Sequence, residues 1–149
     1  MNHDTDQKPR RWLNSATHHH WLTREGLALF EFHRQARLTS GGFAAIDGDG
    51  RIPHGASADT MLTGRMAHSC ALAALQGVPG AAALSEHAIR ALEGKLRDEQ
   101  YGGWFGADPA TSDDRTKQCY THHFVALGPP LRPTPTFPAR RLCSKRPSG

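Results

Sequence analysis

Among the residues of this sequence, Arg65 is the one whose surroundings most clearly indicate a chemical role. It lies in the stretch TMLTGRMAHSCALAAL, residues 60–75, which has the composition of a buried helix. Burying an unpaired guanidinium is costly, so Arg65 needs a partner or must face a polar cavity. In a cavity it could donate hydrogen bonds to the hydroxyl or carbonyl oxygens of a ligand. The alternative is a surface arginine whose aliphatic stem covers apolar neighbours.

A second group of polar side chains opens the stretch KQCYTHHF, residues 117–124. Gln118, Tyr120 and His122 bring mixed hydrogen-bonding groups and an aromatic ring to the start of an apolar helix. A polyhydroxylated ligand requires this combination of donors, acceptors and an aromatic face. An ordinary first helical turn with a solvated face is the alternative.

The histidines and the Asp-Gly repeat do not have the spacing of a metal site. His18, His19 and His20 are consecutive and point in different directions on a helix, and no His-x-x-x-His pair with a carboxylate occurs. The DGDG stretch at 47–50 lacks the glutamate that closes a calcium-binding loop. We therefore expect no metal and no cofactor, and we interpret His68 and His87 as partly exposed helix residues.

Hydrophobic periodicity predicts an all-α chain of about four helices, near residues 15–38, 57–77, 80–97 and 116–127. Ser57 or Asp59 is the expected cap of the second helix, which Gly77 should end. The apolar residues around 47–50 indicate either a two-stranded flap or a tight loop. Long loops that alternate with a short turn favour helical hairpins stacked around an axis.

The net charge of +4 is unevenly distributed along the chain. Residues 1–128 hold 13 of the 18 cations and all 14 acids, so the excess of positive charge lies in the proline-rich segment 129–149. This distribution does not indicate nucleic-acid binding. We expect residues 1–11 to be a disordered lead-in, 12–128 to form the domain and 129–149 to be a disordered tail.

The three cysteines, Cys70, Cys119 and Cys143, are widely spaced and predict neither a disulfide framework nor a metal site. Cys70 is expected to be a core residue. No signal peptide and no apolar run of about 18 residues is visible. A cytoplasmic protein without membrane contact is therefore expected.

Several segments together resemble the N-terminal part of the N-acylglucosamine 2-epimerase family. They are RWL, FEF, GGFAAIDGDGRI, TMLTGRMAHSCALAALQGVPG, LRDEQYGGWF and KQCYTHHFVALG, in the family's order. The sugar-isomerase branch, with the mannose and sulfoquinovose isomerases, is the most similar. The resemblance implies part of an (α/α)6 barrel, a monosaccharide substrate, and proton transfer beside a carbonyl group.

The resemblance also implies roles for individual residues. Arg65 matches an arginine that contacts the sugar near its reacting carbonyl, and Tyr120 matches a tyrosine of the pocket. Met61 stands where family members often carry an aromatic residue, and Gln118 and His122 are expected beside the sugar. The histidines that transfer the proton belong to later helices of the family, and His122 is not one of them.

These observations predict the N-terminal portion of a sugar epimerase or aldose–ketose isomerase that is inactive alone. Two alternatives are a non-catalytic carbohydrate-binding or scaffold protein and a nonfunctional truncated product. The arginine- and proline-rich run at 129–149, where a helix should continue, is typical of a shifted reading frame. Sequencing the locus would test this hypothesis.

Overall fold

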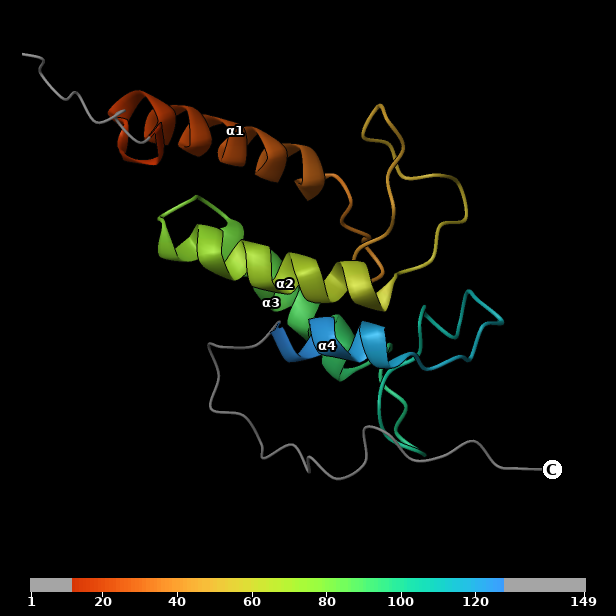
Figure 1. Cartoon of the computed structure of the whole chain (residues 1–149). Helices are drawn as coiled ribbons and strands as arrows, with labels where there is room; N and C mark the ends of the chain where they lie inside the picture. The colour runs from red at the N-terminus through yellow and green to blue at the C-terminus, as the bar shows by residue number, and fades with distance from the viewer. Residues whose placement is uncertain (1–11, 128–149) are drawn as a thin grey trace, which may run out of the picture.

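The structure, a computed structural model, describes residues 12–127 as a series of helices joined by ordered loops (Figure 1). Within this range there is no β-strand and only three isolated β-bridges. The all-α prediction is confirmed, whereas the predictions for residues 1–11 and 129–149 lie outside the described residues. The elements are η1 (Trp12–Asn14), α1 (Ala16–Arg34), α2 (Thr60–Leu75), α3 (Ala81–Glu93) and α4 (Cys119–Leu127).

Helix α2 begins after Asp59, one of the two residues predicted to cap it, and ends just before Gly77 as predicted. The carboxylate of Asp59 accepts a hydrogen bond of 2.7 Å from the Leu62 amide, so it caps the free amides of the first turn. Gly77 adopts a φ of 80° just after the helix. The next amide, that of Val78, returns to the Ala73 carbonyl at 3.0 Å, which closes the last turn.

The first helix is shorter than predicted, because the chain folds into a tight hairpin after it. Helix α1 ends at Arg34 instead of continuing to Leu38. The Leu38 amide donates to the Gly42 carbonyl at 3.0 Å, and the Ala44 amide donates to the Ala36 carbonyl at 2.9 Å. These bonds replace the helical ones and turn the chain back toward α2.

Helices α3 and α4 are also shorter than predicted. Helix α3 ends at Glu93, and Leu96 leaves the helix but stays fully buried. Helix α4 begins at Cys119 rather than near residue 116. The Gly106 amide donates to the Thr116 carbonyl at 3.1 Å, which holds the chain outside the helix at that point.

The segment around 47–50 forms a tight loop, which was one of its two predicted forms. One carboxylate oxygen of Asp47 accepts the amides of Asp49 at 2.9 Å and Arg51 at 2.8 Å. The Gly50 amide donates to the Asp47 carbonyl at 3.0 Å. Asp47 therefore organises the turn through local hydrogen bonds to the backbone.

Helices α2 and α3 share the core, and α4 packs against α2 on the side away from α1 (Figure 1). Burial raises the pKa of the Cys70 thiol to about 11, with a smaller opposing effect of Arg34, so this cysteine is a core residue as expected. The buried apolar residues that form the core include Phe43, Met66, Ala67, Cys70, Leu84, Ala88, Leu92, Leu96, Trp104 and Val125.

The prediction for His87 is wrong, whereas His68 is partly exposed as expected. His87 is buried on α3, where its ring nitrogen lies 3.1 Å from the Gly42 carbonyl oxygen. Its ring also meets Phe43 edge to face, with the centroids 5.7 Å apart. Burial lowers the pKa of His87 because it disfavours the charged imidazolium. A hydrogen bond to a distant backbone group, which the sequence does not reveal, makes this burial tolerable.

Helices α2 and α4 approach each other closely at Gly64. A Cβ atom at this position would lie 2.6 Å from the carbonyl oxygen of Phe124, which is much closer than van der Waals contact. The neighbouring α4 residue Val125 is buried against α2. A residue without a side chain is therefore required at 64 for α4 to occupy its place.

The two long loops, residues 35–59 and 94–118, lie at the same end of the helices (Figure 1). Two lysine–aspartate pairs order the second of these loops. Lys95, just after α3, contacts the Asp108 carboxylate at 2.6 Å. The Asp108 amide donates to the Ala58 carbonyl at 2.9 Å, and the Asp108 carboxylate accepts the Ala110 amide at 3.0 Å. This pair therefore connects the end of α3 to the segment before α2.

The second pair connects the loop after α3 to the segment before α4. One carboxylate oxygen of Asp98 accepts the amides of Gln100 at 2.9 Å and Tyr101 at 3.0 Å. The other carboxylate oxygen pairs with the Lys117 ammonium group, which also donates to the Gly102 carbonyl at 2.8 Å.

The Lys117 hydrogen bond, followed by those of the two amides, lowers the pKa of Asp98. For Asp108, burial raises the pKa, but the bonds from Lys95 and Ala110 outweigh it and the net shift is downward.

Replacing Gly64 by alanine should destabilise the protein, because the added methyl group forces α4 away from α2. We expect the free energy of unfolding to fall by about 1–3 kcal/mol, as for other overpacked sites. Urea unfolding followed by tryptophan fluorescence measures the change. Gly26→Ala on α1 is the matched control, because no atom lies within 4 Å of its added Cβ. That control should raise stability by up to about 1 kcal/mol, and equal effects of both variants would contradict the close approach.

Acid should weaken the fold through Asp98 and Asp108. Folding lowers the pKa of both carboxyl groups, so the unfolded chain binds their protons at a higher pH than the folded chain. The contribution of these two carboxyl groups to the free energy of unfolding should therefore be complete above about pH 5 and should fall as the pH drops below about 4. Urea unfolding at several pH values measures this. In the double variant Asp98→Asn/Asp108→Asn the loss should be smaller, and an unchanged pH profile would refute this assignment.

Candidate functional site

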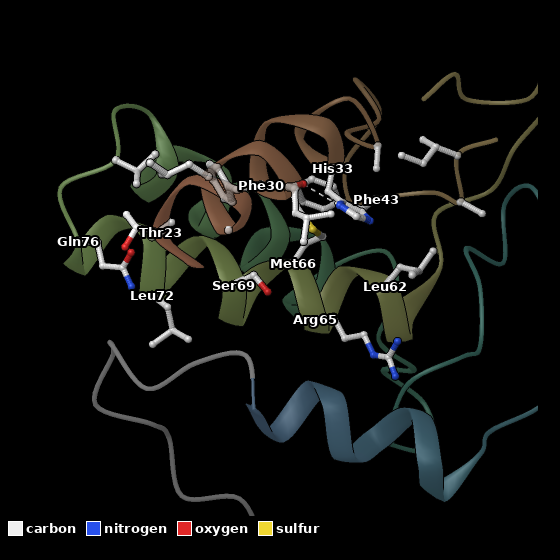
Figure 2. A pocket seen from close by; sticks show the side chains of 18 of the residues that line it. Thr23, Phe30, His33, Phe43, Leu62, Arg65, Met66, Ser69, Leu72 and Gln76 are labelled. Atoms are coloured by element: carbon white, nitrogen blue, oxygen red, sulfur yellow. Dashed lines mark hydrogen bonds between the residues drawn. The ribbon is translucent and has the colours of Figure 1, made fainter. Parts of the chain in front are cut away.

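Arg65 extends from α2 toward α4, at the edge of the space between α1 and α2 (Figure 2). One guanidinium nitrogen, Nη2, lies 3.3 Å from the hydroxyl oxygen of Tyr120, to which it donates. The guanidinium carbon lies 4.3 Å from the ring centroid of Phe124, within the range of a cation–π interaction. The side chain is thus exposed, and aromatic residues of α4 provide its neighbours.

The guanidinium of Arg65 retains donors that could bind a ligand. Its hydrogen bond to Tyr120 uses one of five N–H groups. None of the ion pairs formed among residues 12–127 includes Arg65. A positive charge without a carboxylate partner, resting on an aromatic ring, can donate to carbonyl, hydroxyl or carboxylate oxygens of a small molecule.

Tyr120 and Phe124 are one turn apart on α4 and form a single aromatic surface. Their rings meet edge to face, with centroids 5.1 Å apart and an interplanar angle of 80°. Tyr120 is exposed, whereas Phe124 is partly buried. Residues four apart on a helix lie on the same face, which brings both rings to Arg65. Phe124 was not among the predicted site residues, although its spacing from Tyr120 carried the signal.

The other three predicted site residues differ in how they lie relative to Arg65. Met61 is one helical turn before Arg65 on α2 and is partly buried. Gln118 lies just before α4 and its side chain is exposed. His122 is two residues beyond Tyr120 and therefore faces another side of the helix. The structure brings Arg65 and Tyr120 together, and the roles of all five residues remain predictions.

His122 is engaged with the loop after α3. Its Nε2 atom lies 3.0 Å from the Trp104 amide nitrogen and 3.0 Å from the Trp104 carbonyl oxygen. The Trp104 amide can donate to Nε2 only if Nε2 is unprotonated, whereas Nε2 can donate to the Trp104 carbonyl only if it is protonated. Each neutral tautomer of His122 therefore forms one of these two hydrogen bonds. Its Nδ1 is buried without a hydrogen-bond partner among the described residues. Gly103 permits this approach, because a Cβ there would lie 3.0 Å from the imidazole.

A groove of about 790 Å³ separates α1 from α2 (Figure 2). Arg65 and Ser69 of α2 and Gln76 just after it contribute polar groups, but most of the lining is apolar. A sugar requires many hydrogen-bonding groups, so this lining fits apolar side chains better than a sugar. We therefore place the candidate sugar contact of Arg65 on its α4 side. The apolar side chains along the groove include Leu22, Leu29, Phe30, Leu62, Met66 and Leu72.

The described part of the chain, residues 12–127, contains no group of three or more histidine, cysteine, aspartate or glutamate residues placed to hold a metal ion. In the same range, no helix combines the length and the apolar character needed to cross a membrane.

Comparison with known proteins connects this geometry to a family. The family described as N-acylglucosamine 2-epimerase (GlcNAc 2-epimerase) matches residues 41–129. A D-mannose isomerase from Pseudomonas cannabina pv. alisalensis is 48% identical over 116 residues, which are 78% of this chain and 28% of the relative. A D-mannose isomerase from Thermobifida fusca is 42% identical over 118 residues, which are 78% of this chain and 29% of the relative.

The chain therefore spans less than a third of the length of these curated relatives. The matched region includes Arg65, the aromatic residues of α4 and both lysine–aspartate pairs. Since the family match covers more than half of the sequence, this chain belongs to the N-acylglucosamine 2-epimerase family.

Proposed function

We propose that Arg65, Tyr120 and Phe124 form part of the monosaccharide-binding site of a sugar isomerase or epimerase. The observation that carries this proposal is the guanidinium of Arg65, which lies 4.3 Å from the Phe124 ring centroid and 3.3 Å from the Tyr120 hydroxyl. The relatives named D-mannose isomerase support an aldose as substrate. Met61 and Gln118 would border the same sugar, within a barrel of which this chain forms a part.

The chemistry of such a reaction suits an arginine at this place. Removing the proton from the carbon beside a carbonyl builds negative charge on the carbonyl oxygen, as an ene-diol-like intermediate forms. Arg65 can donate hydrogen bonds to that oxygen and stabilise the charge. It cannot be the base, because a guanidinium stays protonated at any ordinary pH.

The base must then come from elsewhere. The family resemblance assigns proton transfer to histidines in segments that this sequence does not match. His122 is the nearest histidine in sequence to Tyr120, but its ring contacts the Trp104 backbone at 3.0 Å. We therefore propose that this chain alone binds a sugar without isomerising it at a useful rate. A cytoplasmic location and the absence of a nucleic-acid partner remain predictions.

The engagement of His122 also favours a second candidate function, a carbohydrate-binding protein without catalysis. A histidine that holds a loop in place is less available as a base, whereas Arg65 and Tyr120 can still bind a sugar. Binding without proton exchange would support this candidate. Absence of binding to any sugar would support the third interpretation, a product without function.

Titration calorimetry with mannose, fructose and N-acetylmannosamine tests the site. Arg65→Ala should weaken sugar binding roughly 10- to 100-fold, because a charged hydrogen bond contributes about 1.5–3 kcal/mol. Arg90→Ala is the matched control, since Arg90 is an exposed arginine on α3 that pairs with Glu86 at 3.6 Å. That control should bind as the parent does. Equal loss in both variants, or no loss in Arg65→Ala, would refute the proposed contact.

Exchange of the sugar C2 proton in D₂O, followed by NMR, tests catalysis. The purified chain should not accelerate the exchange measurably, because a positioned base supplies typically about 10²–10⁴-fold and the family's histidines are not matched here. Exchange that disappears in both Arg65→Ala and His122→Gln would overturn this prediction and assign His122 a catalytic role. Exchange that survives both changes would indicate a contaminating isomerase.

A further inference from the structure

We propose that Lys117 is a positioning residue that sets Tyr120 against Arg65. It bridges the loop after α3 to the residues just before α4, and so fixes where the helix begins. Its importance for sugar binding rests on the proposed function, but the positioning itself can be measured without any sugar.

Lys117 holds the loop after α3 to the segment before α4, and we call its contacts with Asp98 and Gly102 the clasp. Its ammonium group pairs with the Asp98 carboxylate and donates to the Gly102 carbonyl at 2.8 Å. The same nitrogen lies 5.5 Å from the ring centroid of Phe105 and 5.9 Å from that of Tyr101. The side chain of Asp98 is 9% exposed and that of Lys117 is 26% exposed, so the pair is shielded from solvent more than a surface ion pair would be. Its loss would leave the Asp98 carboxylate without its cation.

Helix α4 depends on this clasp because it is short. It has nine residues, and isolated helices of this length are marginal in water. Lys117 holds the chain two residues before Cys119, and the Thr116 carbonyl accepts the Gly106 amide at 3.1 Å. Beyond the first turn, His122 holds the Trp104 backbone at 3.0 Å. The loop after α3 therefore contacts the chain both before and after the start of α4, at Lys117 and at His122.

The clasp acts unequally on the two aromatic residues of the site. Tyr120 is exposed and lies in the first turn, three residues after Lys117. Phe124 lies one turn later, where its carbonyl packs against Gly64 and its neighbour Val125 is buried. Loosening the first turn should therefore move Tyr120 away from Arg65, while the rest of α4 remains on α2.

The chain offers a matched control in the pair of Lys95 and Asp108. It has similar burial to the Lys117 pair, and its atoms are 2.6 Å apart. It connects α3 to the segment before α2 through the Asp108 amide, which donates to the Ala58 carbonyl at 2.9 Å. Breaking the Lys95–Asp108 pair should lower the free energy of unfolding about as much as breaking the Lys117–Asp98 pair does. It should not displace Tyr120, because Lys95 follows α3 rather than preceding α4.

Fluorine NMR of fluorotyrosine-labelled protein tests the proposal. The chain has two tyrosines, so the Tyr101→Phe background leaves one resonance, from Tyr120, and keeps an aromatic ring beside Lys117. Arg65→Met in this background gives the resonance position of Tyr120 without its guanidinium neighbour. In Lys117→Met, the Tyr120 resonance should shift from its parent position most of the way to its position in Arg65→Met. Lys117→Arg should restore it in large part, and Lys95→Met should leave it at the parent position.

Two outcomes would overturn the proposal. One is a Lys117→Met resonance that stays at the parent position, and the other is an equal displacement by Lys95→Met. Far-ultraviolet circular dichroism verifies that each variant is folded. If Lys117→Met does not fold, Asp98→Asn removes the charge partner with little change of shape and is judged by the same criteria. Failure of the parent protein to bind sugar would refute the proposed function but leave this result unaffected.

Discussion

The close approach of α2 and α4 at Gly64 is the constraint on which the candidate site depends. A side chain at 64 would collide with the Phe124 carbonyl, so only glycine lets the two helices meet at this distance. The next residue along α2 is Arg65, and the contact therefore places its guanidinium directly against the aromatic surface of α4. A packing requirement of the backbone thus decides where the positive charge of the site lies.

The loops at the same end of the helices complete this arrangement. Asp98 and Asp108 are buried carboxylates that each accept backbone amides and pair with one lysine, so their desolvation is offset by several charge-assisted hydrogen bonds. Both pairs lie within the loop between α3 and α4. The pair with Lys95 orders the entry to α2, whereas the pair with Lys117 orders the entry to α4. The two helices that carry the site are therefore both set by the same connecting loop.

The parts of this structure that the sequence predicted are those governed by local rules. The number of helices, the cap at Asp59 and the end of α2 at Gly77 follow from periodicity and from backbone preferences. The early end of α1 and the late start of α4 could not be predicted, because they depend on hydrogen bonds to backbone groups of the loops, which helical periodicity does not reveal. The burial of His87 has the same origin. The meeting of Arg65 and Tyr120 was expected only through the family resemblance, and Gly64 explains it physically.

The loose attachment of α1 has a consequence for the cooperativity of the fold. Only one residue of this helix, His18, is buried, and a groove separates it from α2. The free energy of opening α1 locally is therefore well below that of unfolding the remaining helices, which share the core. Amide hydrogen exchange in the native state would then divide the chain into two units, with α1 exchanging through its own openings. Any apolar segment that filled the groove would merge the two units into one.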